Sequence, residues 1–208
     1  MTKEDCVVEV ASVQRFGAAL VCLLGLGVSA CSNTAVDLTY NRAAVTAKPV
    51  AAKPVVEMLS VTDARKNPST RIGAIRGGFG NPLKTLEVST PVKDIVRQAF
   101  LDGLGARGLL ASPGSGAYGI ELTVKRLDSS QLMRREAHSD FLVTVIDKAS
   151  GRPIYAKQVE DNRADGEASG AGIFGSVEEL RAYTNDSLQA AVDKALDNPL
   201  FLAAIGVR

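Results

Sequence analysis

The sequence feature that most constrains the fold is an apolar run near the N-terminus, "RFGAALVCLLGLGVSAC", from Arg15 to Cys31. No charged residue lies between these two, and the strongly apolar core, "AALVCLLGLGV", is eleven residues long. A helix needs roughly 20 apolar residues to cross a bilayer, so the run is too short for a membrane span. A basic residue, an apolar region and then small residues are the order of a secretory signal peptide. We therefore expect residues 1–30 to be a signal peptide that is removed; the alternative is a buried helix that ends at a core cysteine.

The residues before Cys31 resemble the lipobox of bacterial lipoproteins, in which an apolar residue and two small residues precede a cysteine. Here these residues are Val28, Ser29 and Ala30. The resemblance implies that cleavage occurs before Cys31, that its sulfur carries a diacylglycerol, and that its new amino terminus is acylated. Residue 32 is serine and not aspartate. By analogy with enterobacterial lipoproteins, we expect an outer-membrane lipid anchor with the domain facing the periplasm.

The fourteen residues before Arg15, "MTKEDCVVEVASVQ", fit a signal peptide poorly. They carry three acidic residues, whereas the leading region of a signal should be short and basic. Either the signal is unusually long or translation begins nearer Val13, and we favour the later start. N-terminal sequencing of the precursor distinguishes the two.

Cysteine usage and net charge exclude several classes of function. The chain has three cysteines, Cys6, Cys22 and Cys31, so a chain cleaved before Cys31 keeps one sulfur, which is lipidated. Disulfides, a thiolate nucleophile and a cysteine metal site are then excluded. The formal net charge of +1 gives no electrostatic preference for nucleic acid. The folded part must therefore be stabilised by its core.

Residues 31–54 have the composition of a tether. They are rich in small and polar residues and contain the repeat "AKPV" at Ala47–Val50 and Ala52–Val55. Pro49 and Pro54 fix their own backbone and bias the preceding lysines to extended geometry. We expect a stiff spacer that holds the domain away from the lipid; the alternative is that part of the segment is an edge strand.

Residues 55–208 show the pattern of a single α+β domain with the order ββαβββα. Thr90 and Pro91 predict the start of a first amphipathic helix, with Thr90 as the capping residue. Ser176 and Glu179 form a capping box that predicts the start of the last helix. Alternating apolar residues predict an antiparallel meander between the two helices. The expected strands are 55–61, 71–76, 117–128, 137–148 and 152–161, in a mostly antiparallel sheet on which both helices pack.

Two glycine motifs, "GLGARG" at Gly103–Gly108 and "GAGIFG" at Gly170–Gly175, match the G-x-G-x-x-G spacing of dinucleotide-binding proteins. That site requires a strand running directly into the glycine turn and a helix behind it. The first motif falls where a helix ends, which is typical of a glycine C-cap. The second follows a long loop. We expect no nucleotide and no other cofactor.

The remaining polar residues do not converge on a catalytic or metal site in the sequence pattern. His138 is the only histidine, and its neighbours Ser139 and Asp140 alternate faces of a strand, so no triad is expected. We expect solvated surfaces for two further groups. These are the carboxylates Glu160, Asp161, Asp165 and Glu167, and the basic residues Lys125, Arg126, Arg134 and Arg135.

The pattern from about Val55 to Leu202 resembles the YajG-type family of bacterial outer-membrane lipoproteins. The resemblance is carried by "VEMLSVTDARKNPSTRIG", by the helix that begins with proline, and by the strands "YGIELTVKRLD" and "FLVTVIDKASGRPIYAKQVE". Its most specific part is the turn Asp63-x-Arg65 with Ile72 and Gly73 after it. The resemblance implies a compact α+β domain in the periplasm and carries over no catalytic residue. The AKPV repeat and "GEASGAGIFG" do not map onto the family pattern.

We expect a non-catalytic adaptor or structural component of the cell envelope rather than an enzyme. Its partners are membrane lipid, through acylated Cys31, and an envelope protein that the sequence does not identify. Glycine-rich loops at Gly77–Asn81 and Gly170–Phe174 predict contact through Phe79, Ile173 and Phe174, although these side chains could instead close the core. The alternative function is a lipid carrier or transport auxiliary with an apolar ligand between helices and sheet.

Overall fold

The computed structural model describes residues 34–35, 37–46, 55–165 and 175–207. These residues confirm the α+β class and the order ββαβββα, with one further strand, β4, before the first long helix and additional short elements at both ends. The helices are η1 (Arg42–Ala44), α1 (Val92–Ala106), α2 (Val177–Leu196) and α3 (Pro199–Ala204). The strands are β1 (Thr34–Ala35), β2 (Val56–Asp63), β3 (Arg71–Arg76), β4 (Pro82–Glu87), β5 (Tyr118–Gln131), β6 (Arg135–Asp147) and β7 (Arg152–Ala164).

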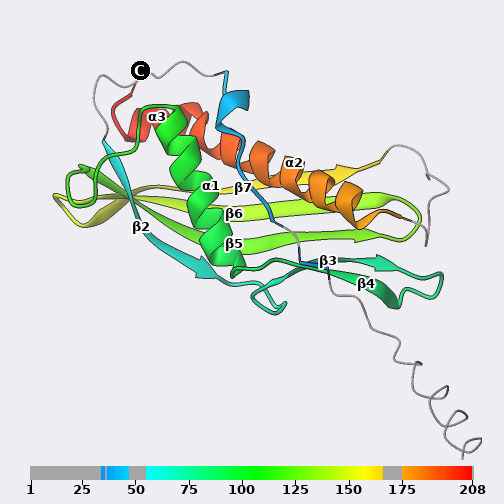
Figure 1. Cartoon of the computed structure of the whole chain (residues 1–208). Coiled ribbons are helices and arrows are strands. Elements are labelled where there is room, and N and C mark those ends of the chain that lie inside the picture. Colours follow the sequence, from blue (N-terminus) through cyan, green and yellow to red (C-terminus); the bar gives the residue numbers. More distant parts are fainter. Residues whose placement is uncertain (1–33, 36, 47–54, 166–174, 208) are drawn as a thin grey trace, which may run out of the picture. The chain divides into compact units, whose positions relative to one another are not determined.

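In the described part of the chain, seven strands form one mixed sheet with the order β1-β4-β3-β5-β6-β7, and β2 pairs with β5 (Figure 1). The predicted meander is confirmed, since β5 pairs antiparallel with β6 and β6 with β7. Strict alternation explains these strands: Ile120, Leu122 and Val124 are buried while Glu121 is exposed. The meander therefore presents one apolar face.

The first half of the sheet is built differently, because β2 and β3 both pair in parallel with the same side of β5. β2 pairs along Tyr118–Val124, and β3 pairs farther on, along Ser129–Gln131. Gly73 allows the second pairing, since a Cβ there would lie 2.6 Å from the backbone oxygen of Ser129. The β3–β4 hairpin consequently extends the sheet past the end of β2.

The connection between β2 and β3 is held by Arg65. Its side chain is 2% exposed and forms an ion pair of 2.9 Å with Asp63. Arg65 Nη1 also donates hydrogen bonds to the carbonyl oxygens of Arg71 at 2.9 Å and Leu127 at 3.1 Å. The Asp63-x-Arg65 turn picked out in the sequence is thus a structural turn that fixes where β3 begins.

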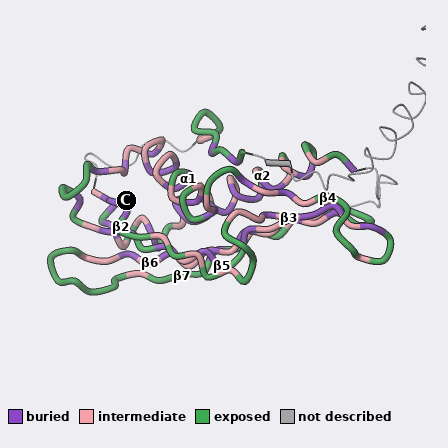
Figure 2. Tube along the Cα trace, turned by 60° about the horizontal axis from the view of Figure 1, so that its bottom comes forward, coloured by how far each residue is buried: buried purple, intermediate pink, exposed green. Residues whose placement is uncertain are grey.

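Helices α1 and α2 lie side by side on one face of the sheet (Figure 1), and the core fills the space between them and the strands. Phe100 of α1 packs edge-on against Phe141 of β6, with ring centroids 5.9 Å apart. Figure 2 shows buried residues along this interface, while outer strands alternate between exposed and partly buried residues. The largest fully buried side chains include Phe100, Phe141, Phe201, Ile72, Ile75, Leu86, Leu104 and Leu109.

Two helix ends follow the sequence prediction and one differs. Gly108, with φ +67°, terminates α1, and Leu109 N donates 2.9 Å to Leu104 O, as in a glycine C-cap. Ser176 caps α2 through Glu179 N. The start of α1 differs from the prediction: Pro91 is the N-cap, no side chain caps the helix, and Val92 N instead donates 2.9 Å to Ser69 O.

Residues 37–46, which we call the strap, correct the expectation of a tether for this part of 31–54; residues 31–33, 36 and 47–54, with most of the AKPV repeat, lie outside the described residues. Leu38 and Tyr40 are buried in the core, and β1 pairs in parallel with β4 at the sheet edge. The physical reason is the alternation of apolar Leu38 and Tyr40 with polar residues, which gives the strap one face to bury. The edge-strand alternative is confirmed for Thr34–Ala35, and the domain begins well before residue 55.

Candidate functional site

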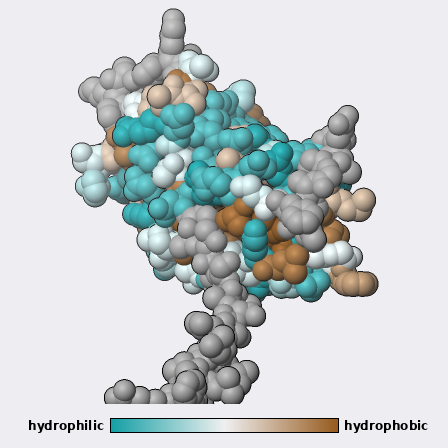
Figure 3. Space-filling view, turned by 45° about the vertical axis from the view of Figure 1, so that its right-hand side comes forward, coloured by the Kyte–Doolittle hydropathy of each residue, from teal (hydrophilic) through white to brown (hydrophobic). Residues whose placement is uncertain are grey.

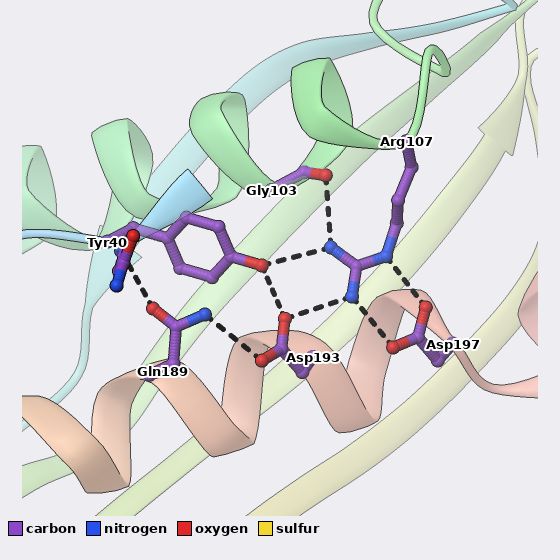
Figure 4. A network of polar contacts seen from close by, with 7 residues as sticks. Tyr40, Gly103, Arg107, Gln189, Asp193 and Asp197 are labelled. Atoms are coloured by element: carbon purple, nitrogen blue, oxygen red, sulfur yellow. Dashed lines mark hydrogen bonds and ion pairs between the residues drawn. The ribbon is translucent and has the colours of Figure 1, made fainter. Parts of the chain in front are cut away.

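The strap is fastened between α1 and α2 by a network centred on the guanidinium of Arg107 (Figure 4). Arg107 follows the last turn of α1, and its side chain is 3% exposed. Its Nε and Nη2 each donate a hydrogen bond of 2.7 Å to the carboxylate of Asp197. Nη2 also donates 2.9 Å to Asp193, and Nη1 donates 3.0 Å to the hydroxyl oxygen of Tyr40. One buried cation therefore connects the strap, α1 and α2.

Tyr40 completes the network by donating its hydroxyl hydrogen to Asp193. Burial and this hydrogen bond raise the pKa of Tyr40 to about 12. The backbone of the strap adds two contacts with α2, because Thr39 N donates to Asn185 Oδ1 and Asn41 N donates to Gln189 Oε1, both at 2.8 Å. The strap is thus held by its side chains and by its backbone.

Gly103 makes room for this packing. A Cβ there would lie 2.8 Å from Leu196 Cδ1 and 3.0 Å from Val192 Cγ1, both on α2. It would also lie 3.4 Å from Tyr40 Cζ. The first glycine of "GLGARG" therefore serves the close approach of two helices and the strap, and not a nucleotide.

A second feature is the end of the sheet where the β3–β4 and β5–β6 turns lie. Because β3 is parallel to β5 and Ile75 pairs with Gln131, both strands finish at this end. Four large apolar side chains are exposed on or beside the turns, and we call this surface the hairpin end. They are Phe79 (102% exposed), Leu83 (47%), Leu132 (38%) and Met133 (69%).

Figure 3 brings this side of the molecule forward and shows hydrophobic residues gathered on one part of a mostly polar surface. A cavity of about 520 Å³ lies beside the β5–β6 turn, and its lining includes Leu132, Met133, the basic residues Arg76 and Arg134, and the acidic residues Glu136 and Asp165. A second cavity, of about 400 Å³, adjoins it through Arg76 and Ser130, and is polar. The hairpin end thus combines exposed apolar groups with charged side chains of both signs.

Three residues were predicted from the sequence to contact a partner, and the structure describes one of them. Phe79 is fully exposed at the tip of the β3–β4 turn, so the alternative that it closes the core is wrong. Ile173 and Phe174 lie outside the described residues, as does the lipidation motif of Val28, Ser29, Ala30 and Cys31.

The histidine and its neighbours occupy the alternating faces expected of a strand. His138 Nδ1 lies 2.7 Å from Asn162 Oδ1 on the face without helices. The buried Ser139 Oγ faces α2 and lies 2.9 Å from Ser187 Oγ. Burial and the charge of Glu160 raise the pKa of Asp140. These groups belong to separate contacts and do not assemble a triad.

The carboxylates and basic residues of the outer surface mostly pair with one another. Asp161 pairs with Arg163 at 2.6 Å, and Asp165 pairs with Arg135 at 2.6 Å. Within residues 34–35, 37–46, 55–165 and 175–207, no group of three or more histidine, cysteine or acidic residues is placed to hold a metal ion. Arg126 pairs with Asp128 and Arg134 with Glu136, and Glu167 lies outside the described residues.

Sequence reasoning missed Tyr40, Arg107, Asp193 and Asp197 as a group. One signal was present: Asp193 and Asp197 lie at the C-terminal end of α2, where the helix dipole disfavours negative charge. Two acids four residues apart at such a position indicate a neighbouring cation. The pattern does not identify which arginine supplies it.

Comparison with known proteins shows the fold and not the family. No protein-family model matches the chain, and a search of curated proteins finds no significant match. Among solved structures, protein XCC0632 of Xanthomonas campestris, of family DUF330, matches with a TM-score of 0.56 and 15% identity over 83% of this chain and 95% of that one. At this identity the likeness shows a shared α+β fold alone.

PelC of Paraburkholderia phytofirmans, solved as a dodecamer, matches with a TM-score of 0.42 and 11% identity over 78% of this chain and 95% of that one. This score is too low to carry an argument. Among the described residues, no helix has the length and apolarity to span a membrane.

Proposed function

We propose that this chain is a lipid-anchored, non-catalytic adaptor of the bacterial cell envelope, held in the outer membrane with its domain in the periplasm. The observation that supports this best is the strap. Cys31 precedes Thr34 by three residues, and the strap that follows is bound to both long helices through Arg107 and Tyr40. A lipid on Cys31 therefore holds the folded domain through a fastened segment.

The partner-facing surface that we propose is the free edge of β7. This strand of 13 residues lies at the end of the strand order, so its outer side has no partner among the described strands. An unpaired strand edge offers backbone donors and acceptors that a second protein can extend. Most of its side chains are exposed, and polar residues such as Lys157, Gln158 and Glu160 are among them, which fits a reversible contact. Membership of the YajG-type family is part of the same proposal.

The carrier alternative receives less support from the described residues. It needs a cavity between helices and sheet, but that space is filled by side chains such as Phe100, Leu104 and Phe141, which are fully buried. The cavities at the hairpin end are lined by residues of the strands and turns.

The anchor is tested with two cysteine variants of the full chain, Cys31→Ser and Cys22→Ser. We expect Cys31→Ser to lose the mass of the lipid and to remain uncleaved, while Cys22→Ser, the matched control in the same apolar run, is processed normally. Intact mass and membrane fractionation give the readout. Normal lipidation of Cys31→Ser would refute the anchor.

The adaptor role is tested by photo-crosslinking in cells. A photoreactive residue at Ala156, exposed on β7, is compared with one at Gln98, exposed on α1. We expect a discrete protein adduct from Ala156 and none from Gln98. Adducts that are absent or equal at both positions exclude β7 as the partner surface.

A further inference from the structure

The direction of β1 relates the lipid anchor to the hairpin end. β1 is parallel to β4, and Thr34 pairs with Leu86. β4 begins at Pro82, directly after the β3–β4 turn, so its N-terminal end lies at the hairpin end. The N-terminal end of β1 faces the same way. The chain that leads to Cys31 therefore joins the domain from the side of Phe79 and Leu83.

Chain length limits how far the anchor lies from this surface. Cys31 and Thr34 are three positions apart, and a fully extended chain covers at most about 3.6 Å per residue, or about 11 Å in all. Leu83 and Leu86 are three positions apart on β4, which corresponds to about 10 Å along the strand. A lipid attached at Cys31 is consequently confined to the neighbourhood of the hairpin end.

The composition of the hairpin end fits such a surface. Phe79 and Met133 project from two different turns and are 102% and 69% exposed. Arg76 and Arg134 line the neighbouring cavity together with Glu136 and Asp165, and Arg134 pairs with Glu136 at 2.8 Å. Lys84 follows Leu83 on β4 and is exposed, and a long basic side chain can reach lipid headgroups while its stem contacts apolar groups. Apolar side chains that enter the interfacial layer add to the attachment that the acyl chains of Cys31 supply.

We propose that the hairpin end is a membrane-contact surface: Phe79, Leu83, Leu132 and Met133 enter the interfacial layer of the membrane that holds the lipid of Cys31. This inference rests on the proposed lipidation. It replaces the protein contact that the sequence suggested for Phe79, because the register of β1 directs this surface to lipid. It also leaves the β7 edge free for a protein partner.

The test uses tryptophan as a reporter, since the chain contains none. Phe79→Trp and Leu200→Trp are prepared in the full, lipidated protein and reconstituted in vesicles of phosphatidylethanolamine and phosphatidylglycerol that contain brominated phospholipid. Leu200 is the matched control: it is 65% exposed but lies on α3, which packs on β7 near Tyr155, at the opposite end of the sheet. We expect strong quenching of the tryptophan fluorescence in Phe79→Trp and little quenching in Leu200→Trp.

Equal quenching at both positions, or none at position 79 in protein whose lipid is confirmed by mass, overturns the inference while leaving the anchor intact. Absence of the lipid refutes the proposed function instead. In that case Cys31→Ser carrying Phe79→Trp is titrated with the same vesicles. Quenching of the tryptophan then supports the membrane-contact surface, and an absence of quenching refutes it.

A substitution at Phe79 distinguishes whether the hairpin end contacts lipid or protein. We expect Phe79→Ser to weaken vesicle binding of the unlipidated Cys31→Ser chain about tenfold or more, because a fully exposed phenyl ring loses its burial in the interface. The melting temperature should not change, since Phe79 has no buried contact to lose. A photoreactive residue at position 79 that yields a discrete protein adduct in cells, with vesicle binding unaffected by Phe79→Ser, overturns the lipid assignment.

Discussion

The hydroxyl oxygen of Tyr40 accepts a hydrogen bond of 3.0 Å from Arg107 Nη1, although the two residues lie 67 positions apart in the chain. Tyr40 belongs to the strap and Arg107 to the end of α1. The same guanidinium contacts Asp193 and Asp197 at the end of α2. Fastening of the N-terminal segment therefore depends on one arginine, and this dependence can be measured.

Arg107→Met should lower the free energy of unfolding by about 3 kcal/mol, because it leaves Asp193 and Asp197 close together without their cation. Both carboxylates are partly exposed, which keeps the loss below that of a fully buried pair. Urea denaturation measures the change. Arg152→Met, at an exposed position on β7, is the control and should stay within about 0.5 kcal/mol of the parent. Equal effects of the two substitutions would show that the network does not stabilise the fold.

Leu38→Ala should destabilise the domain by about 2 kcal/mol, because it removes a buried side chain of the strap from the core. The neighbouring Thr39→Ala changes an exposed residue and should have little effect on stability. Thermal unfolding compares the two. If both variants melt like the parent, residues 37–46 behave as the free spacer that the composition suggested.

Tyr40→Phe should change how stability depends on alkaline pH. Because burial and the hydrogen bond to Asp193 raise the pKa of Tyr40 from 10.0 to about 12, the folded protein keeps this proton after the unfolded chain has lost it. The stabilisation is complete below pH 10 and is lost as the pH rises toward 12. In denaturation series from about pH 9 to 12, the parent should lose more stability than Tyr40→Phe. An equal loss of stability in the parent and in Tyr40→Phe would contradict the raised pKa of Tyr40.

Asp63→Asn should change how stability depends on acidic pH. Burial alone would raise the pKa of Asp63, but the hydrogen bonds and charge of Arg65 outweigh it and hold the pKa below 3.8. The stabilisation is present above pH 3.8 and is lost as the pH falls through the lower, folded-state pKa. We expect the variant to be less stable by about 1–2 kcal/mol at neutral pH and to approach the parent in strong acid.

Asp186→Asn, at an exposed position on α2, is the control for this series. Its unfolding curves should follow those of the parent at both pH values. A constant difference between Asp63→Asn and the parent across the acid range would mean that the carboxylate charge does not hold the turn.

The meander could be predicted from sequence because alternation specifies which side chains are buried. Ile120, Leu122 and Val124 mark β5 without knowledge of its neighbours. Alternation does not specify which strand lies alongside, so the parallel pairing of β2 and β3 with β5 could not be read from it. That pairing is decided by contacts far apart in sequence, such as Arg65 with Leu127.

The candidate sites were predictable to different degrees. The glycines around Phe79 indicated an exposed turn, because a tight turn at Gly80, with φ +81°, is a local property. The strap was obscured because small and polar residues dominate the composition of residues 31–54, whereas burial depends on Leu38 and Tyr40. The Arg107 network joins residues up to 153 positions apart, and no local pattern reports such a contact.

The position of Asp193 in the chain also sets an order of assembly. Tyr40 lies near the start of the described residues, and its acceptor Asp193 follows 153 positions later. A chain that is translocated with its N-terminus first therefore delivers the strap long before α2 exists to receive it. In the exported, lipid-anchored form that we propose, the strap is therefore the first part of the domain to cross, and it docks only when α2, the last long helix, has formed.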